Sequence, residues 1–206
     1  MPMERDPRLH FVVATAIIVK DGPSTNAQGK PKFLIAKRAP HEKAFPNYWS
    51  VPGGKLVMHE YNHLPRGFRN RHHDDYGEGG VGRKVQGSSR VGKPRSGVRN
   101  REVSKEERSD DPQWYNVVDW VLRKEVKEEV GLEIERPQYL CDLVFVRPDG
   151  YPVVTLSYWA NYKGGEVKLS KDLTEYAWVT ADEAKQYELI DGISDELAEV
   201  EKRLRA

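Results

Sequence analysis

The hydrophobic residues of this chain gather in short runs separated by polar segments that contain glycine and proline. Runs 11–20 and 32–37 are rich in Val, Ile, Phe and Leu. The intervening segment 21–31 contains Gly, Pro, Asn and Ser, which is typical of a loop that joins two paired strands. The pattern therefore predicts two neighbouring strands of one sheet near the start of the chain.

The second half of the chain continues the pattern and predicts a mixed α/β protein. Runs 138–146 and 152–163 flank a Pro-Asp-Gly turn, which predicts a second hairpin. Segment 175–179 is a short candidate strand, and 181–187 and 194–204 are candidate helices. The last of these carries apolar residues at helical spacing, so we expect an amphipathic helix there.

Segment 112–131 is predicted to be an amphipathic helix. Asp111 is a candidate N-cap, Pro112 fits the first helical position and Gly131 fits the end of the helix. Its apolar residues recur at helical spacing; they are Trp114, Val117, Val118, Val121, Leu122 and Val126.

Three carboxylates lie on or beside the apolar stripe of this helix. We take about 100° of rotation around the helix axis per residue and set Val118 at zero. Glu125 then lies at about −20°, Glu129 at about +20° and Glu128 at about −80°. Carboxylates on a helix surface are usually solvated, but these positions face the expected sheet. The helix thus presents clustered acids toward a core.

A cation is the expected partner of these acids. The basic residues Arg123, Lys124 and Lys127 are expected to point elsewhere on the helix, and clustered carboxylates facing a core are costly without positive charge among them. Mg²⁺ prefers carboxylate oxygens and keeps water molecules that can react. The geometry therefore predicts a metal site, with a solvated charge run as the alternative.

Charge is distributed unevenly along the chain. Segment 66–108 holds 12 Lys and Arg against 6 Asp and Glu, 8 glycines and few apolar residues, which is the composition of a disordered insert. The rest of the chain carries 21 basic against 26 acidic residues. Contact of the insert with RNA or another polyanion stays an alternative to simple solvation.

Cysteine content and hydropathy restrict the compartment. Cys141 is the only cysteine, which excludes an internal disulfide framework and a cysteine-rich zinc site. The longest apolar run, 11–19, is too short to cross a bilayer. We expect a soluble cytoplasmic protein that has no membrane partner.

Two separated stretches together resemble the Nudix box, a glycine followed after five residues by glutamate and later by REUxEExGU, where U is aliphatic. Gly54 and Glu60 match the first part, and the sequence KEVKEEVGL at 124–132 matches the second, with Lys124 in place of arginine. The usual seven-residue spacer is replaced by 63 residues, 61–123. The flanking sequences WSVPGGKL at 49–56 and YAWV at 176–179 also resemble the family.

The resemblance implies an α/β/α sandwich with a mixed β-sheet, formed by a single domain, 9–206, into which the basic insert 66–108 is placed. It also implies a metal-dependent hydrolase that cleaves the pyrophosphate linkage of a nucleoside diphosphate derivative. Mg²⁺ is the implied cofactor, with Mn²⁺ as an alternative. A small anionic nucleotide is the implied substrate, and a homodimer is one open assembly state.

The resemblance assigns roles to individual residues. Glu125 and Glu129 would be catalytic; the implied metal ligands are Gly53 through its carbonyl, Glu125, Glu128 and Glu129. Glu125 is either a ligand or the base that activates water. Gly54, Glu60 and Lys124 would orient the box, with Lys124 supplying a single point charge where arginine supplies a planar fork.

Residues outside the box are candidates for substrate binding, each with a structural alternative. Arg38 either meets a substrate phosphate or caps the sheet edge, and Asp172 and Glu175 either complete the site or are ordinary loop acids. Phe45, Tyr48 and Tyr151 are candidates for stacking on a nucleobase. The alternative for the whole protein is a catalytically weakened scaffold that binds polyanions through its insert.

Overall fold

The computed structural model describes residues 9–20, 29–64 and 113–205. Contacts divide the chain into two units, one formed by Met1–Asn62 with Asn116–Ala206 and one formed by His63–Tyr115. The predictions made for insert 66–108, for Asp111 and for Pro112 lie outside the described residues. The first unit contains every strand and helix of the described chain, and the description below concerns that unit.

The described residues form a single mixed sheet of eight strands. Strand predictions for 11–20 and 138–146 are confirmed to the residue. The strands are β1 (Phe11–Lys20), β2 (Lys32–Arg38), β3 (Trp49–Ser50), β4 (Gly53–Lys55), β5 (Glu133–Ile134), β6 (Gln138–Val146), β7 (Pro152–Gly164) and β8 (Leu173–Val179).

Strand β1 lies at the centre of this sheet and is paired on both sides. It runs parallel to β7 from Phe11 to Val19, and on its other side it pairs antiparallel with β4 through Val13, Ala14 and Thr15 and with β2 near its end. Strands β6 and β7 form the predicted antiparallel hairpin. The register places Thr15 opposite Gly53, so the turn before β4 is fixed against the middle of β1.

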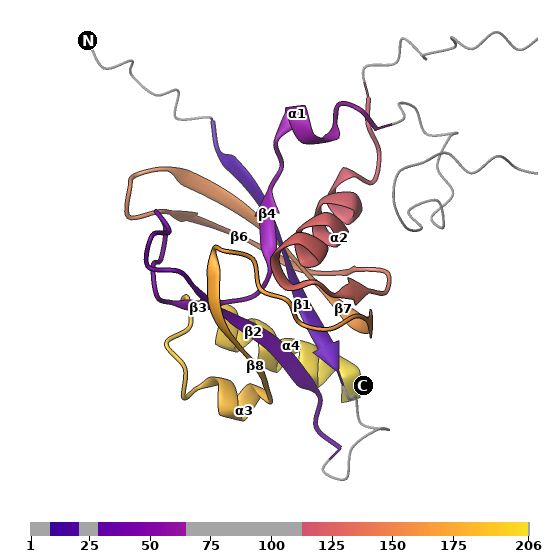
Figure 1. Cartoon of the computed structure of the whole chain (residues 1–206), viewed down its shortest axis with the longest axis vertical. Helices are drawn as coiled ribbons and strands as arrows, with labels where there is room; N and C mark the ends of the chain where they lie inside the picture. Colours follow the sequence, from indigo (N-terminus) through magenta and orange to yellow (C-terminus); the bar gives the residue numbers. More distant parts are fainter. Residues whose placement is uncertain (1–8, 21–28, 65–112, 206) are drawn as a thin grey trace, which may run out of the picture. The chain divides into compact units, whose positions relative to one another are not determined.

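The largely apolar sequence of β1 follows from burial on both faces of the sheet. Ala16 and Ile18 belong to a core cluster with Val126 of helix α2 (Val117–Val130). Ile17 and Val19 belong to a second cluster with residues of helix α4 (Ile193–Arg205). Figure 1 shows α2 in front of the sheet and α4 behind it, so the predicted α/β/α sandwich is confirmed.

Helix α2 is shorter at its start than predicted. It begins at Val117, whereas the prediction placed Pro112 in its first turn. Asn116 adopts a left-handed conformation, with φ 55°, so the chain before it cannot continue the helical path. The predicted end is confirmed, because Gly131 has φ 76° and its N–H donates to the Lys127 carbonyl.

Other boundaries also differ from the prediction. Helix α3 (Ala181–Ala184) ends three residues before the predicted end, after a capping box formed by Thr180 and Glu183. Strand β8 begins at Leu173, two residues early, because its pairing with β2 extends to Arg38 through an irregularity in register. The short elements β3, β4, β5 and α1 (Met58–Tyr61) were not predicted, since two to four residues give no periodicity. Among the described helices, none has the length and apolarity needed to cross a membrane.

Candidate functional site

A cavity of about 930 Å³ opens over the sheet between α2, the start of α4 and the loop that follows β2. Gly53 and Gly54 of β4 and the carboxylates Glu125 and Glu129 of α2 line one part of its wall. Two elements that are 62 residues or more apart in sequence therefore contribute to the same surface. The two halves of the predicted box thus meet in space.

The two glycines of β4 permit this close approach. A Cβ on Gly54 would lie 2.3 Å from the carboxyl carbon of Glu125, and a Cβ on Gly53 would lie 2.4 Å from the Ala14 carbonyl oxygen. Both distances are shorter than any real contact, so a side chain at either position would displace its neighbour. Gly54 therefore determines how closely Glu125 approaches the sheet.

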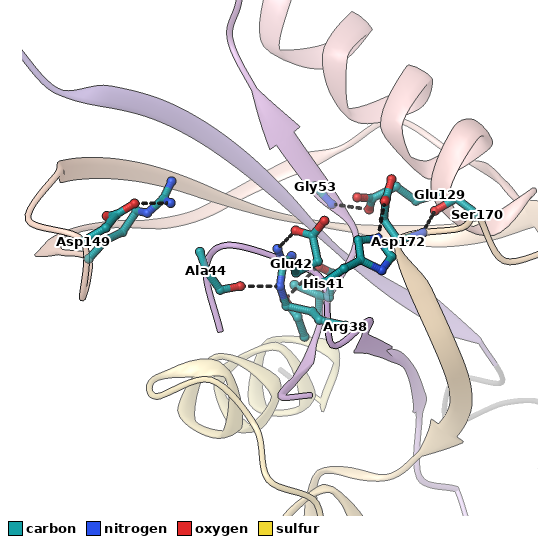
Figure 2. Close-up of polar contacts among 12 residues, drawn as sticks. Arg38, His41, Glu42, Ala44, Gly53, Glu129, Asp149, Ser170 and Asp172 are labelled. Carbon is teal, nitrogen blue, oxygen red and sulfur yellow. Dashed lines mark hydrogen bonds and ion pairs between the residues drawn. The ribbon is translucent and has the colours of Figure 1, made fainter. Parts of the chain in front are cut away.

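Glu129 is held by the backbone of β4. The N–H of Gly53 donates to its Oε2 at 3.0 Å (Figure 2). Burial raises the pKa of Glu129 to about 7, and the Gly53 hydrogen bond opposes that rise only in part. A carboxyl group with this pKa takes up and releases a proton near neutral pH.

Lys124 contacts three carboxylates of the cluster. Its Nζ lies 3.1 Å from Glu125 Oε1, 3.0 Å from Glu128 Oε2 and 3.3 Å from Glu60 Oε2. The expectation that this lysine points away from the acids is wrong, because its long flexible chain bends back over the helix surface. Although partial burial lowers the pKa of Lys124, hydrogen bonds to Glu128 and Glu125 raise it above its usual value.

Glu60, on α1, is incompletely satisfied. Its Oε2 is buried and accepts no hydrogen bond among the described residues, although Lys124 Nζ is 3.3 Å away. An ion pair at this distance without hydrogen-bond geometry leaves much of the desolvation cost of the oxygen uncompensated. The predicted pairing of Glu60 with Lys124 is thus present in the structure as a loose contact.

The carboxylate cluster fits a divalent cation. Three carboxyl groups, those of Glu60, Glu125 and Glu128, share the ammonium group of Lys124. The fourth, that of Glu129, accepts from the Gly53 N–H. Burial also raises the pKa of Glu125, and Lys124 opposes that rise only in part. Oxygen donors of this kind match the preference of Mg²⁺, and they include the buried Glu60 oxygen.

A second polar group lies on the loop after β2, beside the box (Figure 2). Arg38 donates from Nε to the Ala44 carbonyl at 2.9 Å and pairs with Glu42. His41 Nε2 lies 3.1 Å from Asp172 Oδ1. Arg38 therefore holds the shape of its own loop while lining the cavity, and its contact with a substrate phosphate stays a prediction.

The remaining predicted substrate-binding residues separate into two sets. Phe45 and Asp172 line the cavity together with Arg38. Tyr48, Tyr151 and Glu175 are not part of its wall: the Tyr151 ring packs 5.0 Å from that of Phe11, and Glu175 pairs with Lys37 at 2.8 Å on the surface.

The structure also adds cavity residues that sequence reasoning missed. These are His41, Glu42, Phe145, Arg147, Asp191 and Glu196. None belongs to a recognisable spacing, because the loops and strand ends that carry them are brought together only by the sheet. The turn sequence around residue 149 was the single available signal, since it fixes where the strand before it must end.

Comparison with known proteins finds similarity in structure. No family model and no curated protein matches the sequence. The MutT protein from Methanosarcina mazei Go1 superposes with a TM-score of 0.56 at 16% identity, covering 98% of this chain and 100% of that one. The MutT NUDIX hydrolase from Burkholderia pseudomallei gives 0.55 at 19% identity, covering 94% and 99%.

A third similar structure is the NUDIX domain of Shewanella oneidensis NrtR, complexed with ADP ribose, with a TM-score of 0.57 at 13% identity, covering 97% of this chain and 94% of that one. Sequence identities at this level carry information on the fold and not on the reaction. The mixed sheet, its covering helices and these superpositions agree with one another. The chain has the fold of the Nudix hydrolases.

Proposed function

We propose that this protein is a divalent-metal-dependent hydrolase that cleaves the pyrophosphate linkage of a nucleoside diphosphate derivative. The observation that carries the proposal is the pair of partly buried carboxyl groups of Glu125 and Glu129, which line one cavity. Glu125 is paired with Lys124, whereas Glu129 accepts only the Gly53 N–H among the hydrogen bonds of the described residues. Such a concentration of acids is costly for folding and is the arrangement that metal-assisted hydrolysis needs.

We assign each residue of the cluster a separate role in hydrolysis. Glu125, Glu128 and Glu129 would hold the cation together with the Gly53 carbonyl, and a bound divalent cation supplies neutralisation of the diphosphate and acidification of the attacking water. Glu125, where it does not itself bind the cation, would accept a proton from that water. The contact between Lys124 and Glu60 would hold α1 beside α2 at the cluster.

A nucleotide substrate is supported by two structural relatives. The NrtR domain was solved with ADP ribose, and another relative is an Ap4A hydrolase from C. elegans, with a TM-score of 0.54 and 14% identity. ADP ribose and Ap4A, the compounds in the names of these two structures, are both nucleotides that contain phosphoanhydride bonds. We therefore assign a nucleotide with such a bond to this cavity, with Mg²⁺ or Mn²⁺ as the cation.

The test is release of a nucleoside monophosphate from a panel of nucleoside diphosphate derivatives with Mg²⁺. We expect turnover by the wild type and its loss in Glu129→Gln, while the control Glu133→Gln, which alters a surface pair with Lys127, stays active. If no substrate is hydrolysed and RNA still binds, the protein is instead a catalytically weakened scaffold that binds polyanions.

A further inference from the structure

The cavity extends well beyond the carboxylate cluster, to the turn between β6 and β7. Phe45, Phe145 and Arg147 line this end, and we call them the distal subsite. Along β1, Thr15 pairs with Gly53 at the cluster, whereas Phe11 is aligned through Val153 with Phe145. Thr15 and Phe11 are four residues apart on β1, which corresponds to about 13 Å along the strand. This distance between the carboxylate cluster and the distal subsite leaves room for a ribose and a phosphate.

Two aromatic rings form one wall of the distal subsite. The ring centroids of Phe45 and Phe145 are 6.2 Å apart, at an interplanar angle of 52°. Phe45 has a φ of 52°, a left-handed conformation that an aromatic residue rarely adopts. The loop therefore accepts backbone strain at the residue whose ring reaches the cavity, and the wall it forms suits a flat apolar surface.

Arg147 adds directed hydrogen-bond donors beside these rings. The turn holds its backbone, because its N–H donates to the Tyr151 carbonyl at 2.9 Å and its own carbonyl accepts from Gly150 at 2.8 Å. Asp149 accepts from Nη2 at 2.7 Å, and in Figure 2 Asp149 lies on the other side of Ala44 from Gly53 and Glu129. The charged group is thus placed at the far end from the acids.

The hydrogen bonding of Arg147 is incomplete. Its side chain is 12% exposed, and its Nε–H is buried and has no acceptor among the described residues. An arginine that served only to close the turn would have its donors paired, since a buried unpaired donor costs free energy. Because Arg147 lines the cavity, an acceptor on a bound ligand would satisfy this donor.

We propose that the distal subsite binds the nucleobase of the substrate and that Arg147 selects a purine with two acceptors on one edge. This inference rests on the proposed function, whose diphosphate it places at the carboxylate cluster. The planar guanidinium matches O6 and N7 of guanine or hypoxanthine, whereas adenine presents an amino donor in place of O6. Arg147 is therefore a specificity-determining residue.

Binding of the monophosphates GMP, IMP and AMP, measured by calorimetry with Mg²⁺, tests the proposal without requiring turnover. We expect GMP and IMP to bind with similar affinity and about tenfold more tightly than AMP. Arg147→Met should bring all three within about twofold of one another, by weakening GMP and IMP alone. Arg136→Met, which removes an exposed arginine outside the cavity, should leave the preference intact.

Each other outcome overturns the inference. Equal affinity of the wild type for GMP and AMP, no binding of any monophosphate at millimolar concentration, or a preference that survives Arg147→Met would each do so. Equal weakening of all three ligands by Arg147→Met would mean that this arginine binds phosphate. If Arg147→Met does not fold, Arg147→Lys serves instead, because it keeps the charge and removes the planar pair of N–H donors. We expect this variant to lose the preference for GMP and IMP over AMP as well. Selective binding without hydrolysis of any nucleoside diphosphate derivative would separate failure of the proposed function from failure of this inference.

Discussion

Partly buried carboxyl groups occur on both faces of the sheet, and their hydrogen-bond partners differ between the two regions. On α4, Glu196 accepts a hydrogen bond from Ser157 Oγ at 2.6 Å, and Thr15 donates to that hydroxyl at 3.3 Å. On α2, Glu125 and Glu129 lie together and receive one backbone N–H and one lysine. Burial raises the pKa of all three carboxyl groups.

The difference explains why a cation is proposed for the α2 acids and not for Glu196. A lone carboxyl group such as Glu196 can remain protonated, because a neutral acid beside hydroxyl groups leaves no charge to compensate. Two inner acids with Glu60 and Glu128 nearby cannot all be neutralised by Lys124 alone. Burial by itself is therefore not the ground for the proposed metal site; the ground is that several carboxyl groups lie around one lysine.

The largest expected effect comes from removing one charge in each region. Glu125→Gln should lower kcat/KM for a hydrolysed nucleotide by at least about 100-fold, because it removes a charge that holds the cation. Glu196→Gln should lower kcat far less, because Glu196 lines the cavity from α4 and is bonded to Ser157 and not to the acids of α2. Steady-state kinetics with Mg²⁺ measure both. A comparable loss of kcat in the two variants would mean that the α4 acid belongs to the reacting centre.

A glycine substitution perturbs the α2 region without changing charge. In Gly54→Ala the new Cβ would lie 2.3 Å from the carboxyl carbon of Glu125, so Glu125 must move. We expect about a tenfold to 100-fold loss of kcat/KM and a loss of roughly 1–3 kcal/mol in the free energy of unfolding.

Gly164→Ala is the matched control for Gly54→Ala. No atom lies within 4 Å of the Cβ position at Gly164 on β7, so neither activity nor stability should change. Wild-type kinetics in Gly54→Ala would show that the position of Glu125 is not restricted by this glycine.

Sequence reasoning predicted the sheet and the box well because both have strong local signals. The apolar run of β1 and the acids at helical spacing in α2 depend only on neighbouring residues. The start of α2 was wrong because the left-handed conformation of Asn116 has no signature in the hydrophobic pattern. The predicted direction of the Lys124 side chain was wrong because a helical wheel gives only the direction of the Cα–Cβ bond. A long side chain can bend away from that direction.

The rest of the cavity could not be predicted, since it is assembled by tertiary structure. Phe145 and Arg147 reach it only because the β6–β7 hairpin pairs in the observed register. Glu196 looks like any polar residue of an amphipathic helix until Ser157 of β7 is seen beside it. Contacts across a sheet depend on register, which a single sequence specifies only through the whole fold.

A smaller expected effect is the pH dependence of stability with and without Mg²⁺. In the folded protein, burial raises the pKa of Glu129 from its ordinary value of 4.5 to about 7. Ionisation therefore disfavours the folded state, and the free energy of unfolding falls as pH rises from 4.5 to 7, by on the order of 3 kcal/mol. Mg²⁺ should restore that stability, because it binds the ionised form. Melting temperatures should therefore rise with Mg²⁺ at pH 8 and change little at pH 5.

The variant Glu129→Gln is the control for this experiment. It removes the titrating group, so most of the pH dependence and most of the response to Mg²⁺ should be lost together. A metal response of equal size at pH 5 and pH 8 would show that proton release from Glu129 is not coupled to binding.

The smallest expected effect is on the stability contributed by Glu196. Its pKa in the folded state is raised, mainly by burial, so the folded protein favours the protonated acid and loses stability as pH rises above the value of the unfolded chain. Glu196→Gln is neutral at every pH, and its amide oxygen can still accept the Ser157 hydrogen bond. We expect the variant to melt a few degrees above the wild type at pH 8 and at the same temperature at pH 4. A variant that melts lower at pH 8 would mean that the folded protein stabilises Glu196 as an anion. Glu196 would then resemble the acids of α2 in needing positive charge or hydrogen-bond donors around it.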